Sequence, residues 1–159
     1  MLLFLIYIFL NYVIILWYQV GEKMNRRSFL LEMRKSGQLK GDKPCFVVLK
    51  YSDESRIYRG EYIFSQRNDN LYFQKINRLF EMLRPKDDFT VKVNSFIGFK
   101  FEYSSRRNSF ILFKENGDIL KLDYMVGLKE TFSTEENMER IAKVLTEKGL
   151  KRIEGDING

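Results

Sequence analysis

Four strand-length segments between residues 89 and 126 constrain the fold of this chain more than any other feature. They read FTVKVNSF, IGFKFEYS, SFILFKE and ILKLDYMV, at residues 89–96, 97–104, 109–115 and 119–126. In the segments at 97–104 and 119–126, apolar residues alternate with charged ones, which is typical of strands with one buried and one solvated face. The short polar stretches SSRRN and ENGD separate the last three segments. The pattern therefore predicts an antiparallel meander.

The alternation also assigns the two faces of this meander. The residues predicted to face the core are Phe99, Phe101, Phe110, Leu112, Leu120 and Leu122. The residues of opposite parity, predicted to form a charged face, include Lys100, Glu102, Lys121 and Asp123. Asn116-Gly117 predicts a type I′ turn between the last two strands, with positive φ at both residues.

The segments that precede the meander give one clear and one ambiguous prediction. Residues 45–51 (CFVVLKY) and 56–66 (RIYRGEYIFSQ) have strand length and flank a polar turn, so they predict a hairpin. Residues 70–83 have apolar side chains at helical spacing and are followed by Pro85, although their aromatic-rich start also suits a strand at 70–75. We predict a helix over 70–83.

The C-terminal part of the chain predicts one amphipathic helix. Its apolar stripe consists of Met138, Ile141, Ala142 and Leu145. Ser133 and Glu136 have the spacing of a capping box at its start, and Gly149 supplies a C-terminal cap. The LKRI stretch that follows predicts a short edge strand.

The first 20 residues, MLLFLIYIFLNYVIILWYQV, contain no charged side chain. A helix of roughly 20 apolar residues is long enough to cross about 30 Å of hydrocarbon. Trp17 and Tyr18 lie where interfacial aromatic anchors are expected. A cleavable signal peptide is disfavoured, because the run lacks a basic start and a small-residue cleavage site. Residues 1–21 therefore predict a single transmembrane anchor.

The flank of this run predicts its orientation. Residues 22–43, a basic juxtamembrane helix and linker, hold seven bases and three acids. By the positive-inside rule, the N-terminus would face outward and the domain at 44–159 would lie in the cytoplasm. The bases predicted to contact the membrane surface are Lys23, Arg26, Arg27, Arg34 and Lys35.

Residues 21–24 support a second interpretation of the N-terminus. Gly-Glu-Lys-Met is what a purine-rich ribosome-binding site would encode if it were translated just upstream of a start codon. In that case Met24 is the first residue, and the chain is a soluble cytoplasmic domain. We favour the anchor.

Together these segments predict an α+β fold: an N-terminal single transmembrane helix, then an antiparallel β-meander of about six strands with a C-terminal amphipathic helix packed on the sheet. This architecture resembles bacterial pleckstrin-homology-like domains that are tethered to membranes. The resemblance is one of architecture alone, without a shared motif, and a fold does not imply a function.

The side chains available for chemistry are few. The chain has no histidine and one cysteine, Cys45, so it can build neither an intramolecular disulfide nor a Cys/His zinc site. Histidine is also the usual acid or base near neutral pH. The carboxylates lie in predicted turns or on an exposed strand position and lack the spacing of a calcium loop. We predict a chain that is not an enzyme and has no metal or cofactor. We expect Cys45 to be a small side chain that fills space in the core.

The charge distribution points to an anionic partner. The formal net charge is +6, and residues 130–159 hold seven acids and five bases, so residues 1–129 carry +8. A basic body suits anionic lipid, nucleic acid or an acidic protein. Nucleic acid is disfavoured, because Arg106 and Arg107 lie in a predicted turn and no arginine-rich recognition helix is present.

These observations predict a membrane-tethered cytoplasmic module that binds a protein or an anionic lipid at the inner leaflet. One alternative is a small immunity or regulatory protein that neutralises a partner protein. A further alternative is a soluble domain that starts at Met24 and has an unknown binding role.

Overall fold

The computed structural model describes residues 11–13, 28–52, 56–77, 82–83, 85–105, 107–125 and 134–154. The chain divides into two units, Met1–Leu39 and Lys40–Gly159. In the first unit, residues 11–13 and 28–35 are helical. The second unit contains the sheet.

The second unit is mostly β-sheet. Its described strands are β1 (Asp42–Ser52), β2 (Ile57–Arg67), β3 (Asn70–Asn77), β4 (Met82–Leu83), β5 (Phe89–Lys92), β6 (Phe96–Glu102), β7 (Arg107–Lys114), β8 (Ile119–Met125) and β9 (Lys151–Arg152). Its described helices are two short 3-10 turns, η1 (Pro85–Asp87) and η2 (Val93–Ser95), and the α-helix α2 (Thr134–Glu147).

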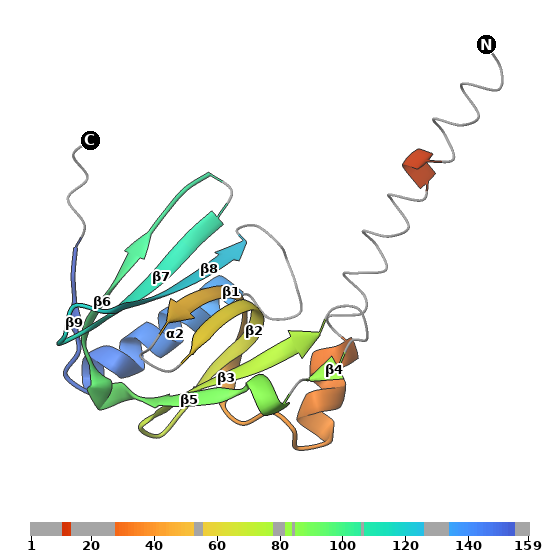
Figure 1. Cartoon of the computed structure of the whole chain (residues 1–159), viewed down its shortest axis with the longest axis horizontal. Helices are drawn as coiled ribbons and strands as arrows, with labels where there is room; N and C mark the ends of the chain where they lie inside the picture. Colours follow the sequence, from red (N-terminus) through yellow and green to blue (C-terminus); the bar gives the residue numbers. More distant parts are fainter. Residues whose placement is uncertain are drawn as a thin grey trace, which may run out of the picture. The chain divides into compact units, whose positions relative to one another are not determined.

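The strands form one sheet in the order β4-β3-β2-β1-β8-β7-β6-β9, with β5 also paired to β3. Neighbours are antiparallel except for β9, which runs parallel to β6. Strand β1 is central, because it pairs with β2 on one edge and with β8 on the other. It therefore joins the N-terminal hairpin to the meander β6–β8 (Figure 1).

The sheet curls so that its two halves face each other. The rings of Phe64 on β2 and Phe110 on β7 are 6.4 Å apart, although β1 and β8 lie between these strands in the sheet. Strand twist accumulates in this way across an antiparallel sheet. The resulting core cluster takes residues from both halves and from α2.

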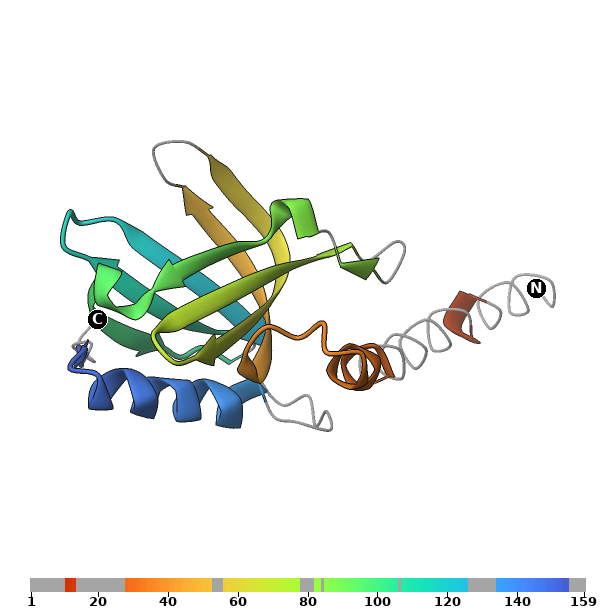
Figure 2. The ribbon, with the colours of Figure 1, turned by 90° about the horizontal axis from the view of Figure 1, so that it is seen from below.

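Helix α2 runs along one side of the curved sheet (Figure 2). Its apolar stripe is buried as predicted: Met138, Ile141 and Leu145 are fully buried, and Ala142 is nearly so. The 3.6-residue period places these side chains on one face of the helix, where they close the core. The predicted capping box lies partly outside the described residues, because Ser133 is not among them.

The predicted fold class is wrong in its balance of elements and in its N-terminal element. The described chain is mostly β-sheet and has more strands than the sequence predicted. No helix within the described ranges is long and apolar enough to cross a membrane, so a fold class with an N-terminal transmembrane helix, and the description as a single-pass membrane protein, are not supported. Of residues 1–21, only 11–13 are described.

The helix predicted over residues 70–83 is also wrong. Residues 70–77 form β3, which pairs with both β2 and β5, and Met82–Leu83 form β4. Leu71 and Phe73 are fully buried, whereas Tyr72 between them is only half-buried, which is the two-residue period of a strand. Pairing on both edges of β3 overrode the helical spacing of its apolar side chains.

Residues 89–96, predicted as one strand, are divided: β5 ends at Lys92 and pairs with β3, and the 3-10 turn η2 separates it from β6. Three other local predictions are confirmed. β1 and β2 form the hairpin, β6–β8 form the meander, and Lys151–Arg152 form the short edge strand. The turn type at Asn116-Gly117 is wrong. Gly117 has a φ of 87°, but Asn116 is not among the described non-glycine residues with positive φ, so the turn is not type I′. Gly117 instead ends a three-residue loop as its left-handed residue.

Candidate functional site

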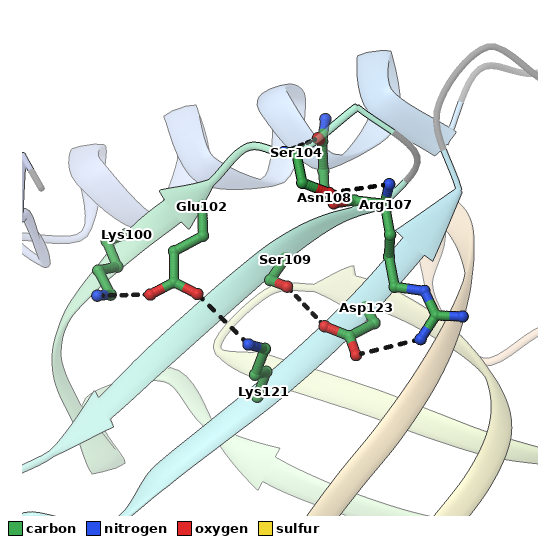
Figure 3. Close-up of polar contacts among 8 residues, drawn as sticks. All are labelled: Lys100, Glu102, Ser104, Arg107, Asn108, Ser109, Lys121 and Asp123. Carbon is green, nitrogen blue, oxygen red and sulfur yellow. Dashed lines mark hydrogen bonds and ion pairs between the residues drawn. The ribbon is translucent and has the colours of Figure 1, made fainter. Parts of the chain in front are cut away.

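The side chains of β6, β7 and β8 that point away from the core form a polar surface. The outward side chains of β1 and β2 continue this surface. We call the whole surface, over these five strands, the outer face. Figure 3 shows its polar contacts on β6–β8. The parity predicted from the sequence is confirmed: Phe99, Phe110, Leu112, Leu120 and Leu122 are fully buried, and Phe101 packs against the core. The charged residues Lys100, Glu102, Lys121 and Asp123 are therefore on the opposite side of the sheet.

Glu102 lies between two lysines on this face (Figure 3). Its carboxylate is 2.7 Å from Lys100 Nζ and 3.3 Å from Lys121 Nζ. The hydrogen bond from Lys100 is the largest cause and lowers the pKa of Glu102; burial opposes it, and the hydrogen bond from Lys121 lowers the pKa further. Glu102 is therefore held ionised near neutral pH.

Asp123 is the second fixed carboxylate of the outer face. Ser109, which is buried, donates a hydrogen bond from Oγ to Asp123 Oδ1 at 2.6 Å. Arg107 Nη1 lies 3.9 Å from the other oxygen of the same carboxylate. Both oxygens of Asp123 thus have partners on the neighbouring strand β7.

The turn between β6 and β7 is held by side-chain contacts rather than by a tight two-residue loop. Ser104 Oγ accepts a hydrogen bond from Arg107 N at 3.1 Å and donates one to the Arg107 carbonyl. Asn108 Oδ1 accepts from Ser104 N at 3.3 Å, while its Nδ2 lies 3.4 Å from Glu135 Oε1 on α2. These contacts attach the tip of the hairpin to the start of the helix.

The strand register places three cations side by side across β8, β1 and β2. Lys50 is the register partner of Lys121 on one edge of β1 and of Arg59 on the other. We call Lys121, Lys50 and Arg59 the basic row. Lys50 and Arg59 are exposed, and within the described ranges neither forms an ion pair. Like charges directly opposite each other in a sheet are destabilising.

A carboxylate row lies next to the basic row, two residues along each strand. It contains Glu102, Asp123 and Glu61. In the strand register, Ser109 lies between Glu102 and Asp123, and Val48 lies between Asp123 and Glu61. The outer face is therefore striped, with one line of positive charge beside one line of negative charge.

Apolar side chains lie within the carboxylate row and at the end of the basic row. Ile111 is only 4% exposed although it is on the outer face, because it lies in register between Lys100 and Lys121. Lysine side chains commonly cover an apolar neighbour with their methylene stems in this way. Val48, Ile119 and Met125, by contrast, are 41%, 51% and 56% exposed on the same face.

The residues predicted to contact a membrane surface precede the sheet-containing unit in the chain. Trp17, Tyr18, Lys23, Arg26 and Arg27 lie outside the described residues. Arg34 and Lys35 are exposed residues of the helix at 28–35, in the first unit. The structure therefore does not test their predicted role.

Sequence reasoning missed Lys50 and Arg59. Their alternation with Val47, Leu49 and Tyr51 on β1, and with Tyr58 and Tyr62 on β2, was a usable signal for outward orientation. Their position beside Lys121 could not be predicted from the sequence, because it depends on the pairing of β1 with β8, which lies more than 70 residues later in the chain.

Comparison with known proteins adds no assignment to this geometry. No protein-family model matches the chain. No curated protein matches it either. The outer face, with its striped charges and exposed apolar side chains, is therefore the basis on which a function is proposed.

Proposed function

We propose that this chain is a non-catalytic interaction module that binds a partner protein through the outer face of its sheet. The observation that carries the proposal is the exposed basic row. Like charges at opposite positions of a sheet destabilise it, on the scale of roughly 0.2–1 kcal/mol per cross-strand pair. A surface with a purely structural role would be more stable with a carboxylate or a threonine in place of Lys50. A partner that supplies the missing negative charge explains the arrangement.

The chemistry of the outer face suits binding better than catalysis. A general acid that works near neutral pH needs a raised pKa, whereas the pKa of Glu102 is lowered by its two lysines. Asp123 is fixed by Ser109 and Arg107 on the neighbouring strand. Fixed, ionised side chains of both signs provide specificity and orientation in a protein interface.

The mixture of side chains favours a protein over a phosphate-rich polymer or a lipid surface. The carboxylate row would repel phosphates next to the basic row. Exposed Val48, Ile119 and Met125 offer apolar contact area, and methionine is enriched in protein interfaces. A nucleic-acid surface is more uniformly basic than this one.

Site-specific photo-crosslinking in cells tests the proposal. A photoreactive amino acid at Val48 or Met125 should give one defined cross-linked protein species. The matched control places the same amino acid at Lys143 or Glu147, which are exposed on α2. The control positions should not give that species. Identical products from both sets of positions, or none from Val48 and Met125, would contradict the proposal.

The compartment is part of the same proposal. Cys45 is the single cysteine and is unbridged and buried, which suits a reducing compartment such as the cytoplasm. Cell fractionation tests this point: the chain is expected in the cytoplasmic pool. If the cross-linked partner is an enzyme whose activity falls when the chain binds, the narrower role of a neutralising regulator follows.

A further inference from the structure

We infer that the partner presents an acidic protein segment whose carboxylates lie along the basic row of Lys121, Lys50 and Arg59. The inference rests on the proposed function and specifies the chemistry of the partner. It goes beyond a general attraction to a basic protein, because it assigns recognition to three side chains on three neighbouring strands.

The register fixes how these three cations are arranged. Lys121, Lys50 and Arg59 are direct partners on β8, β1 and β2. Neighbouring strands are about 4.8 Å apart, so the three side chains start from a line that crosses the sheet. Acidic side chains three or four residues apart on a helix are separated by about 5–6 Å. A segment with such carboxylates can therefore contact all three cations at once.

The cations differ in how far their charge is already neutralised. Lys121 shares Glu102 with Lys100, at distances of 3.3 and 2.7 Å. Lys50 and Arg59 are exposed and have no ion pair within the part of the chain that the structure describes. A carboxylate placed between Lys50 and Arg59 would contact both and remove their mutual repulsion. These two residues are therefore the main determinants of the inferred contact.

The neighbouring rows limit where the acidic segment can lie. The carboxylate row, with Asp123 next to Lys121 along β8, would repel it on one side. On the other side of Lys121, along the same strand, Ile119 is exposed. The segment is thus expected to lie on the basic row and to carry an apolar residue that contacts Ile119.

Binding of fluorescein-labelled poly-L-glutamate to the full chain tests the inference. We expect the substitutions K50E and R59E together to weaken binding about tenfold, as the loss of two charged contacts implies. The matched control, K143E with K151E, changes the net charge by the same amount at exposed positions on α2 and β9. It should weaken binding less than about twofold.

Two further measurements keep the outcome clear. Far-UV circular dichroism checks that both double variants are folded, and K50R with R59K, which keeps both charges, should bind poly-L-glutamate nearly as well as the unchanged chain. Equal weakening by the two charge-reversal pairs would show that net charge alone is responsible and would overturn the inference. Tighter binding of poly-uridylate RNA, or of phosphatidylcholine vesicles with phosphatidylserine, that K50E with R59E abolishes would also overturn it.

Failure of this inference is distinguishable from failure of the proposed function. The photoreactive amino acid at Met125 is combined with K50E and R59E. If the cross-linked partner is lost, and is retained with K143E and K151E, the acidic-segment contact is supported. If the partner persists in both backgrounds, the interaction module stands and the role of the basic row is wrong. If the photoreactive amino acid at Met125 captures no partner even when the basic row is unchanged, the proposed function itself fails.

Discussion

At the scale of single residues, Cys45 shows how burial controls reactivity. Its side chain is fully buried in the core, and its Sγ lies 3.5 Å from the Lys43 carbonyl and 3.7 Å from that of Thr134. Burial raises the pKa of this thiol, because a thiolate would lose its hydration. The core-filling role predicted for Cys45 from the sequence is confirmed.

We expect Cys45 to resist thiol reagents in the folded chain at pH 8. Modification by an aromatic disulfide that releases a coloured thiolate should be slow and should follow the rate of unfolding. It should become complete in denaturing urea. Because this is the only cysteine, the absorbance change reports one site. Complete modification within seconds and without denaturant would show that Cys45 is accessible in the native state.

Glu102 is the residue whose ionisation should affect stability. Its pKa is lowered in the folded chain, first by the hydrogen bond from Lys100 and also by Lys121. A group with a lowered folded-state pKa stabilises the fold above its unfolded pKa of about 4.3, and this contribution is lost as the pH falls through the folded value. The side chain is 44% exposed, so solvent screening keeps the contribution below about 1 kcal/mol.

The substitution E102Q should therefore flatten the pH dependence of stability on the acid side. We expect the difference in the free energy of unfolding between E102Q and the unchanged chain to be largest near neutral pH and to shrink below about pH 4. Urea unfolding at a series of pH values, followed by circular dichroism, measures this. E115Q is a suitable control because Glu115 is an exposed residue of the β7–β8 turn. A difference independent of pH would mean that packing, not charge, is responsible.

At the scale of elements, the β7–β8 turn depends on Gly117. Its φ of 87° lies in the left-handed region, and its N–H donates to the Lys114 carbonyl at 3.1 Å. An added Cβ would meet nothing within 4 Å, so a substitution here changes backbone strain and not packing. Non-glycine residues pay about 1–2 kcal/mol for this conformation.

We expect G117A to lower the free energy of unfolding by about 1–2 kcal/mol, and G117N to lower it less, because asparagine tolerates the left-handed region better. Chemical denaturation of the three chains gives the comparison. If alanine and asparagine were equally tolerated and neither changed stability, the turn would have to rearrange into a different loop.

The elements that the sequence predicted correctly are those whose signal is local. Alternation over β6–β8 gave both the strands and their buried face, and the apolar stripe gave α2 and its packing residues. The prediction for residues 70–77 was wrong because helical spacing and strand alternation coexist there. Pairing with β2 and β5 makes the segment a strand. The charged residues of the outer face on β6 and β8 could likewise be predicted from the sequence, because they alternate with the buried residues of the same strands.

At the scale of the whole sheet-containing unit, the remaining part of the candidate site depends on long-range pairing. The basic row exists because β1 inserts between β2 and β8, which brings Lys50 beside Lys121. Each strand alone shows its outward cation only as part of an alternating pattern. No local rule orders the strands of a sheet, so the adjacency of these charges became visible only in the structure.

The same topology makes the two halves of the sheet and α2 one cooperative structure. The core cluster joins Phe64 and Phe73 from one half to Phe99 and Phe110 from the other, and α2 contributes fully buried Leu145. We expect L145A to lower the free energy of unfolding by about 2–5 kcal/mol, because it leaves a cavity where the helix closes the core. K143A, at an exposed position two residues earlier, should change it by less than about 0.5 kcal/mol.

Urea unfolding of the two variants, followed in parallel by far-UV circular dichroism and by tyrosine fluorescence, distinguishes one cooperative unit from two. Coincident single transitions are expected for both variants, with the midpoint shifted only for L145A. If L145A instead separated the two signals, the hairpin half and the meander half would unfold independently. The basic row spans β8 and β1, where these halves meet, so it would then be lost as soon as either half opened. A single transition therefore also means that the inferred acidic segment should stabilise the whole unit when it binds.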